Sequence, residues 1–271
     1  GLLPTSAQIG IWAVVPLYVL KMVQGFSTGG EYAGASTYVT EFSPDRSRGF
    51  WASWLDVGSY VGFAAGATVV ALTTLITQGL WGPDAMVDGG WRIPFLVAIP
   101  LGIVAIWFRL RIPETPAFEQ ESESAAAPSK DDPMARHGIG GILRHHWRTI
   151  LVAVAIVAAT NTAGYALTSY MPTYLEKEVG LSNLSAAVAT VPVLIVMSAT
   201  LPFVGRLSDR FGRRRIYAFA IGASLVLTIP AFAVMQIGEL WAVFIALGII
   251  AVPVALFVAI SASALPALFP T

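Results

Sequence analysis

One short segment limits what this chain can fold into. The residues Gly205-Arg-Leu-Ser-Asp-Arg-Phe-Gly-Arg-Arg-Arg215 place five arginines and one aspartate between two long apolar stretches. A single charge at the centre of a bilayer costs roughly 2.5–3.5 kcal/mol on insertion scales. This segment, which we call the arginine turn, is therefore incompatible with the hydrocarbon layer. It predicts a polar connection at a membrane surface between two spanning helices.

The composition also indicates a membrane protein. The 271 residues are 56% hydrophobic and 12% charged, with a mean hydropathy of +0.70, whereas soluble domains carry about 25% charged residues. The net charge of zero gives no electrostatic reason to expect nucleic acid as a partner. The absence of cysteine excludes disulfides and cysteine-based zinc sites. We predict an all-α protein with the lipid bilayer around it.

The hydrophobic segments predict seven transmembrane helices, because a spanning helix needs about 20 mostly apolar residues. A polar, acidic and proline-containing segment divides them into three spans and four spans. We therefore predict three parts: residues 1–112 with three spans, a cytoplasmic linker at 113–149, and residues 150–271 with four spans. The predicted spans are 11–40, 51–76, 92–110, 150–174, 185–205, 216–237 and 241–268.

The basic residues predict the orientation of these spans. Of the 16 lysines and arginines, 13 lie in the alternate connections that include the arginine turn, and 2 lie in the opposite set. Cytoplasmic loops are enriched in lysine and arginine. We therefore expect the arginine turn to be cytoplasmic, the first residue of the chain to lie outside the cell and the last to lie inside.

Motif and layout together resemble the major facilitator superfamily, which has six spans, a long cytoplasmic linker and six more spans. The arginine turn is similar to the superfamily's loop between spans 8 and 9. The resemblance implies two helical bundles with seven of twelve helices present, so that the chain is a fragment covering spans 4–10. It also implies that the turn is a conformational latch, whose aspartate lies near a helix N-terminus and whose arginines pair with acidic residues at nearby helix ends. The latch residues are Gly205, Asp209, Arg210, Gly212, Arg213 and Arg214.

Further segments are similar to the metabolite:proton symporters of this superfamily. Gln24-Gly-Phe-Ser-Thr-Gly-Gly-Glu-Tyr32 and Gly90-Trp-Arg-Ile-Pro-Phe95 resemble that branch, and Tyr170-Met-Pro-Thr-Tyr174 resembles its proline/betaine carriers. The resemblance implies a proton-coupled symporter of the bacterial inner membrane that imports a small zwitterionic osmoprotectant such as proline or glycine betaine. It implies the solute and protons as partners and no cofactor. Lys21 departs from the pattern, because the superfamily normally carries arginine there.

Ionisable residues inside spans often mark ion pathways. Lys21, Gln24, Thr28 and Glu31 are spaced so that they share one stripe of a helix, which we expect to face an aqueous cavity. Asp56 lies early in the next span, at a depth similar to that of Glu31. Lys21, Glu31 and Asp56 are the predicted proton-coupling residues. The alternatives are that Lys21 only stabilises the bundle through a carboxylate, and that Asp56 pairs with a loop arginine.

A quaternary ammonium group donates no hydrogen bonds and is recognised best by aromatic faces. The predicted substrate-binding residues combine aromatic, amide, hydroxyl and cationic side chains, with the lysine serving the carboxylate of the solute. The alternative is that the tyrosines favour the membrane interface regardless of substrate. The residues are Lys21, Gln24, Thr28, Tyr60, Asn161 and Tyr165.

No enzyme active site is visible in the sequence, and we expect no metal site. His145 and His146 are adjacent, so they point to different faces of a helix and do not form a ligand pair. The remaining alternatives to zwitterion import are a proton symporter for an organic acid such as a dicarboxylate, and a membrane sensor that transports nothing. A membrane enzyme is the most remote, because no acid–base cluster is present.

Overall fold

The computed structural model describes residues 3–111, the N half, and residues 146–268, the C half, and these contain helices and turns but no strand. The N half begins with α1 (Ser6–Ile9) and the short turn η1 (Gly10–Ala13). Its long helices are α2 (Val14–Phe42), α3 (Arg48–Trp81) and α4 (Arg92–Arg109). The C half contains α7 (Trp147–Tyr165), α8 (Met171–Lys177), α9 (Asn183–Phe211), α10 (Arg213–Met235) and α11 (Leu240–Ala264).

Seven helical segments of the described chain are long and apolar enough to cross a membrane, which confirms the predicted number. Their bounds differ from the prediction in places. The second span was expected at 51–76, but α3 runs from Arg48 to Trp81. Its first turn lies before the apolar run. This turn is helical because the Asp209 side chain of the C half accepts hydrogen bonds from the backbone N–H groups of Gly49 and Phe50. It ends before Gly82, whose φ of 97° lies in the left-handed region.

The fourth span was predicted at about 150–174, and the candidate span at Trp147–Lys177 confirms it with different bounds. Helix α7 begins at Trp147, inside the segment that the sequence assigned to the linker. A π-helical turn, η4 (Ala166–Tyr170), then separates α7 from α8. The rest of the predicted linker, including His145, lies outside the described residues.

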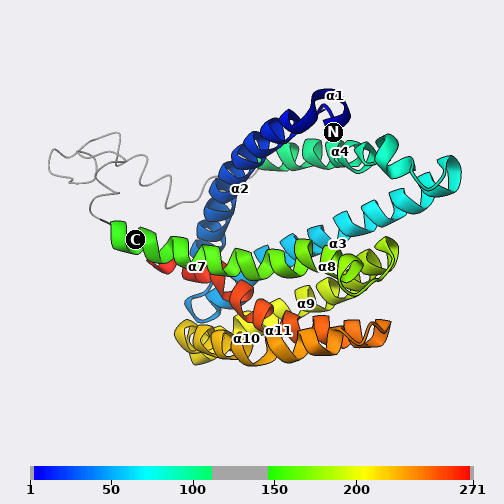
Figure 1. The fold of residues 1–271 in the computed structure, drawn as a ribbon. Helices are drawn as coiled ribbons and strands as arrows, with labels where there is room; N and C mark the ends of the chain where they lie inside the picture. The colour runs from blue at the N-terminus through cyan, green and yellow to red at the C-terminus, as the bar shows by residue number, and fades with distance from the viewer. Residues whose placement is uncertain (1–2, 112–145, 269–271) are drawn as a thin grey trace.

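Helix α11 is the centre of the packed region. It is apolar on every face, which is typical of a helix surrounded by others, and most of its side chains are buried. Helices α9, α10, α3 and α7 pack against it, and α2 reaches it near its C-terminal end. Figure 1 shows α10 and α11 side by side, with α9 and α3 stacked beyond them.

The two halves meet mainly where α3 lies along α9. Helix α4 and the first part of α2 lie away from this contact, and their side chains are largely exposed (Figure 1). The end of α9 meets the short turn η2 (Asp45–Ser47) that precedes α3. The arginine turn of the C half therefore lies against the connection between α2 and α3.

Candidate functional site

Asp209 of the arginine turn caps a helix of the other half. Its Oδ1 accepts a hydrogen bond from the backbone N–H of Gly49 at 2.7 Å, and its Oδ2 accepts one from Phe50 at 2.9 Å. Both N–H groups belong to the first turn of α3, where no intrahelical acceptor is available. The predicted position of Asp209 near a helix N-terminus is thus confirmed. We call these two hydrogen bonds the clamp.

Two glycines allow the clamp to form. A Cβ atom on Gly205 would lie 2.5 Å from the carbonyl oxygen of Gly49 and 2.7 Å from Ser53 Oγ. A Cβ atom on Gly49 would lie 2.6 Å from Asp209 Oδ1. No real Cβ atom tolerates such distances, so α3 and α9 approach this closely only because both positions are glycine. Gly212, between α9 and α10, has a φ of 88°, which also favours glycine.

The arginines of the turn were expected to pair with acidic residues at nearby helix ends. Within residues 3–111 and 146–268 they form no ion pair, so their pairing stays a prediction. The Arg206 guanidinium instead lies 4.7 Å from the ring centre of Phe50, a cation–π contact across the two halves. Asp209, the acidic residue of the turn itself, is turned toward the backbone of α3. The ion pair recorded nearby joins Arg48 to Asp45 at 2.8 Å.

A second polar contact joins the halves along α3, beyond the clamp. The hydroxyl of Tyr32 on α2 lies 3.0 Å and 3.3 Å from the two oxygens of Asp56 on α3. The same hydroxyl lies 3.1 Å from Ser261 Oγ on α11. Asp56 is 6% exposed and Ser261 is 5% exposed. We call this group of Tyr32, Asp56 and Ser261 the bridge. Next to it, Ser36 Oγ donates to the carbonyl of Ala262.

The structure separates the predicted proton-coupling residues. Asp56 is buried in the bridge, whereas Lys21 and Glu31 lie with Gln24 and Thr28 on an exposed face of α2. Tyr32, the neighbour of Glu31, is the residue of α2 that contacts Asp56. The sequence does carry a signal for this, because Tyr32, Ser36 and Thr40 follow one another every four residues and form a polar stripe.

Two of the predicted substrate-binding residues come together in what we call the aromatic seam, formed by Tyr60, Phe63 and Tyr165. The ring centroid of Phe63 lies 6.1 Å from that of Tyr60 and 6.3 Å from that of Tyr165 on α7, at an interplanar angle of 84° to the latter. Tyr60 is 5% exposed and Tyr165 is 54% exposed. The seam therefore joins the halves and leaves one ring accessible.

Two neighbours of Tyr165 on α7 help to define the seam. A Cβ atom on Gly164 would lie 2.8 Å from the Tyr60 hydroxyl, so glycine makes room for that ring. Asn161 is exposed, and its Nδ2 donates to the carbonyl of Val157 at 2.9 Å. The Asn161 amide thus already has a partner in its own helix.

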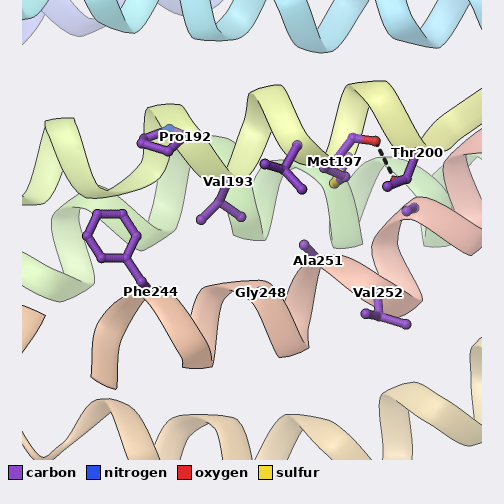
Figure 2. Close-up of a pocket in the computed structure, with 10 residues that line it drawn as sticks. Pro192, Val193, Met197, Thr200, Phe244, Gly248, Ala251 and Val252 are labelled. Carbon is purple, nitrogen blue, oxygen red and sulfur yellow. Dashed lines mark hydrogen bonds between the residues drawn. The ribbon is translucent and has the colours of Figure 1, made fainter. Parts of the chain in front are cut away.

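A groove lies between α9 and α11 (Figure 2). Its volume is about 320 Å³. Its lining is almost entirely apolar, and the Thr200 hydroxyl donates to the Met197 carbonyl at 2.7 Å. None of the predicted site residues lines it. A zwitterion requires partners for both of its charges, which this groove does not offer.

Comparison with known proteins decides the family. Residues 1–271 match the Major Facilitator Superfamily. The chain belongs to this superfamily. It is therefore an α-helical, multi-pass membrane protein built on the superfamily's helical bundles. No solved structure matches the chain significantly.

The similar curated proteins of this superfamily are named transporters and not enzymes. The chain is 64% identical to the ectoine/proline transporter ProP of Corynebacterium glutamicum. It is 42% identical to the glycine betaine/proline/ectoine/pipecolic acid transporter OusA of Dickeya dadantii and to the proline/betaine transporter of Escherichia coli. Each comparison covers 100% of this chain and 54% of the relative. The chain thus spans about half the length of these relatives.

Proposed function

We propose that this protein acts as a proton-coupled secondary transporter that imports a small zwitterionic osmoprotectant such as proline, glycine betaine or ectoine. The observation that carries the proposal is the 64% identity, over the whole chain, to a transporter named for ectoine and proline. Relatives at 42% identity are named for glycine betaine and proline as well. These solutes are all zwitterions, so one site with a cation-binding part and a carboxylate-binding part serves them.

The distribution of basic residues supports the bacterial inner membrane with the arginine turn on the cytoplasmic side. Figure 1 places the ends of α2 and α9 and the beginnings of α3, α7 and α10 at one end of the molecule. The arginines of the turn belong to this end. Positive loops are retained in the cytoplasm. The proposed orientation has residue 1 outside and residue 271 inside.

For the solute, we infer that the aromatic seam supplies the cation-binding part. Its rings come from both halves, and transporters of this kind bind their solutes between two bundles near the middle of the membrane. Tyr165 presents the accessible ring, and Tyr60 and Phe63 hold it in place. Lys21, Gln24, Thr28 and Asn161 are proposed to complete the site, with Lys21 binding the carboxylate. All four side chains are exposed, and Asn161 keeps its carbonyl oxygen for the solute while its Nδ2 binds Val157.

For the proton, we infer that Asp56 is the principal carrier, assisted by Lys21 and Glu31. Asp56 is buried between α2, α3 and α11, and no lysine or arginine of the described residues forms an ion pair with it. A buried carboxyl group without a cationic partner is a suitable site for reversible protonation. The clamp is the proposed latch, which joins the halves through Asp209, Gly205 and their neighbours in the arginine turn.

Uptake by the full-length protein tests this function. In bacteria that lack other osmoprotectant carriers, we expect radiolabelled glycine betaine and proline to accumulate several-fold above the empty-vector control. A proton uncoupler is expected to abolish the accumulation, because the solute has no other driving force. Accumulation of 2-oxoglutarate in place of the zwitterions would instead indicate an organic-acid symporter. No uptake of any of the three would favour a sensor.

A pair of matched variants gives the same experiment a control at the site. Tyr165→Leu removes the accessible ring of the aromatic seam, and a lost cation–π contact is worth a decrease of about five-fold in betaine affinity. Tyr170→Leu makes the same change five residues further along, at the end of the π-helical turn η4. There the ring packs against Tyr174 and not against the aromatic seam. Betaine uptake is expected to fall in the first variant and to change little in the second.

A further inference from the structure

The bridge extends one contact beyond the three side chains that define it. Ser261 Oγ lies 2.9 Å from the carbonyl oxygen of Val258 in its own helix, in addition to its contact with Tyr32. A continuous row of four oxygens therefore runs from Asp56 through Tyr32 and Ser261 to Val258. Three contacts at hydrogen-bond distance connect them. Each contact needs one proton between its two oxygens.

Counting protons shows that the ionised form of Asp56 leaves this row incomplete. The hydroxyls of Tyr32 and Ser261 supply two protons for three contacts. If Tyr32 donates to the carboxylate and Ser261 donates to Tyr32, the carbonyl of Val258 receives nothing from Ser261. If Ser261 donates to Val258, two hydroxyl oxygens face each other at 3.1 Å with no proton between them. One of the three contacts therefore lacks a proton in either arrangement.

We propose that Tyr32 and Ser261 form, with Asp56, a bolt between the two halves that is complete only when Asp56 carries a proton. In the protonated form, the carboxylic O–H donates to Tyr32, Tyr32 donates to Ser261, and Ser261 donates to the carbonyl of Val258. All three contacts then hold one proton each, and no proton is left over. Tyr32 and Ser261 act here as positioning residues for the proton on Asp56.

The position of the bolt shows which movement it controls. Asp56 lies seven residues after Gly49 of the clamp, which is about 10 Å along a helix. The bolt therefore lies in the same part of the seam between the halves as the clamp, toward the end that carries the arginine turn. Its three side chains come from α2, α3 and α11, so a movement of one half away from the other at this end must break it.

The coupling of proton to movement follows from linkage, and it rests on the proposed transport function. The form closed at the arginine turn holds the proton in a complete row, so it binds the proton more tightly than the open form. Closure and protonation then favour each other by the same factor. A proton that enters while this end is closed is released when it opens, which is the order that import with a proton requires.

The groups around Asp56 leave it as the carrier of this proton. Tyr32 on α2, Tyr217 on α10 and Tyr60 on α3 are the titratable side chains of the described residues that interact with it. The element α11 presents Ser261, which does not titrate. Tyrosine hydroxyls keep their protons through the neutral range. A pH response of the bridge below about pH 9 therefore reports on Asp56.

Distance measurements on the full-length protein in lipid nanodiscs test the bolt without any solute. None of the 271 residues is cysteine, and any cysteine in the rest of the full-length protein is first replaced with serine. Spin labels are then placed at Glu41→Cys on α2 and Arg215→Cys on α10, both exposed at the end of the arginine turn. We expect the ratio of short to long distances to fall by about five-fold or more when the pH is raised from about 4 to about 9. This factor corresponds to the free energy of one buried hydrogen bond.

Three substitutions decide whether the bridge causes this response. Asp56→Asn carries a permanent N–H donor, so its short-distance population is expected to stay high at both pH values. Tyr32→Phe interrupts the row, and its ratio is expected not to respond to pH. Ser261→Ala interrupts the row on another helix and provides the same test if Tyr32→Phe does not fold. Tyr38→Phe is the control, because it removes a hydroxyl from α2 outside the row. The Tyr38 ring packs against Phe42, and this variant is expected to behave as the wild type.

The proposal is overturned if the wild-type ratio is indifferent to pH, or if Tyr32→Phe and Ser261→Ala keep the wild-type response. A response in Asp56→Asn also contradicts it, because another group would then carry the proton. These outcomes are separate from the uptake experiment. A protein whose distances respond as expected but which accumulates no zwitterion would retain the bolt and lose the proposed solute.

Discussion

Substitution of Gly205 with alanine is expected to destabilise the protein by about 3 kcal/mol, the upper part of the range for overpacking. The added Cβ atom would lie 2.5 Å from the backbone oxygen of Gly49. The Gly49 backbone cannot change its position as a flexible side chain can change its rotamer. Helix α9 must therefore move away from α3. That movement also pulls Asp209 from the two N–H groups that it binds. One methyl group thus disturbs the main contact between the halves.

Gly79→Ala is the matched control, because it makes the same change near the other end of α3. Nothing lies within 4 Å of a Cβ atom at that position. Alanine is a better helix former than glycine by about 1 kcal/mol, so this variant is expected to be neutral or slightly more stable. Thermal unfolding of the purified proteins in detergent compares the two. Equal midpoints for Gly205→Ala and Gly79→Ala would mean that α3 and α9 are not packed as described.

Asp209→Asn is expected to lower solute uptake about ten-fold by weakening the clamp. Asparagine offers one acceptor oxygen where the carboxylate offers two, so either Gly49 or Phe50 is left facing an amide NH₂ group. It also removes the negative charge that the N-terminus of α3 favours. Hydrogen bonds to charged groups contribute about 1.5–3 kcal/mol, which corresponds to at least ten-fold in the ratio of closed to open forms. Uptake of labelled betaine, corrected for the amount of protein in the membrane, measures the effect.

Asp45→Asn is the control for this charge change. Asp45 lies in η2, close to the same seam, but its 2.8 Å ion pair with Arg48 is exposed. Exposed ion pairs contribute little, so uptake is expected to remain near the wild-type rate. Similar losses in both variants would show that net charge at this end matters and that the specific hydrogen bonds of Asp209 do not.

The sequence was sufficient to predict the features that depend on local composition. The seven spans follow from apolar length. The location of Asp209 at a helix N-terminus was implied by the resemblance of the arginine turn to the superfamily's loop. The structure also explains the two glycines of the same motif. Gly205 allows the backbone of Gly49 to approach closely, and Gly212 adopts a positive φ. Such features depend on residues that are close together in the sequence.

The polar stripe of Tyr32, Ser36 and Thr40 is visible in the sequence, but its partners are not, because they depend on how separate helices rotate against each other. Tyr32 and Ser261 are 229 positions apart. Adjacent residues of a helix point about 100° apart, so the Glu31 stripe that the sequence analysis selected and the Tyr32 stripe face different directions. Only packing against α3 and α11 decides between them. The π turn at Ala166–Tyr170 likewise has no signal in an apolar run.

The most direct test of proton-coupled transport is the movement of protons itself. The full-length protein is reconstituted in liposomes that contain a pH-sensitive dye, with no ion gradient at the start and with a potassium ionophore to dissipate voltage. Adding glycine betaine outside is expected to acidify the lumen as solute enters, and Asp56→Asn is expected to abolish the acidification. Entry of labelled betaine into wild-type liposomes without any change in lumenal pH would contradict the account.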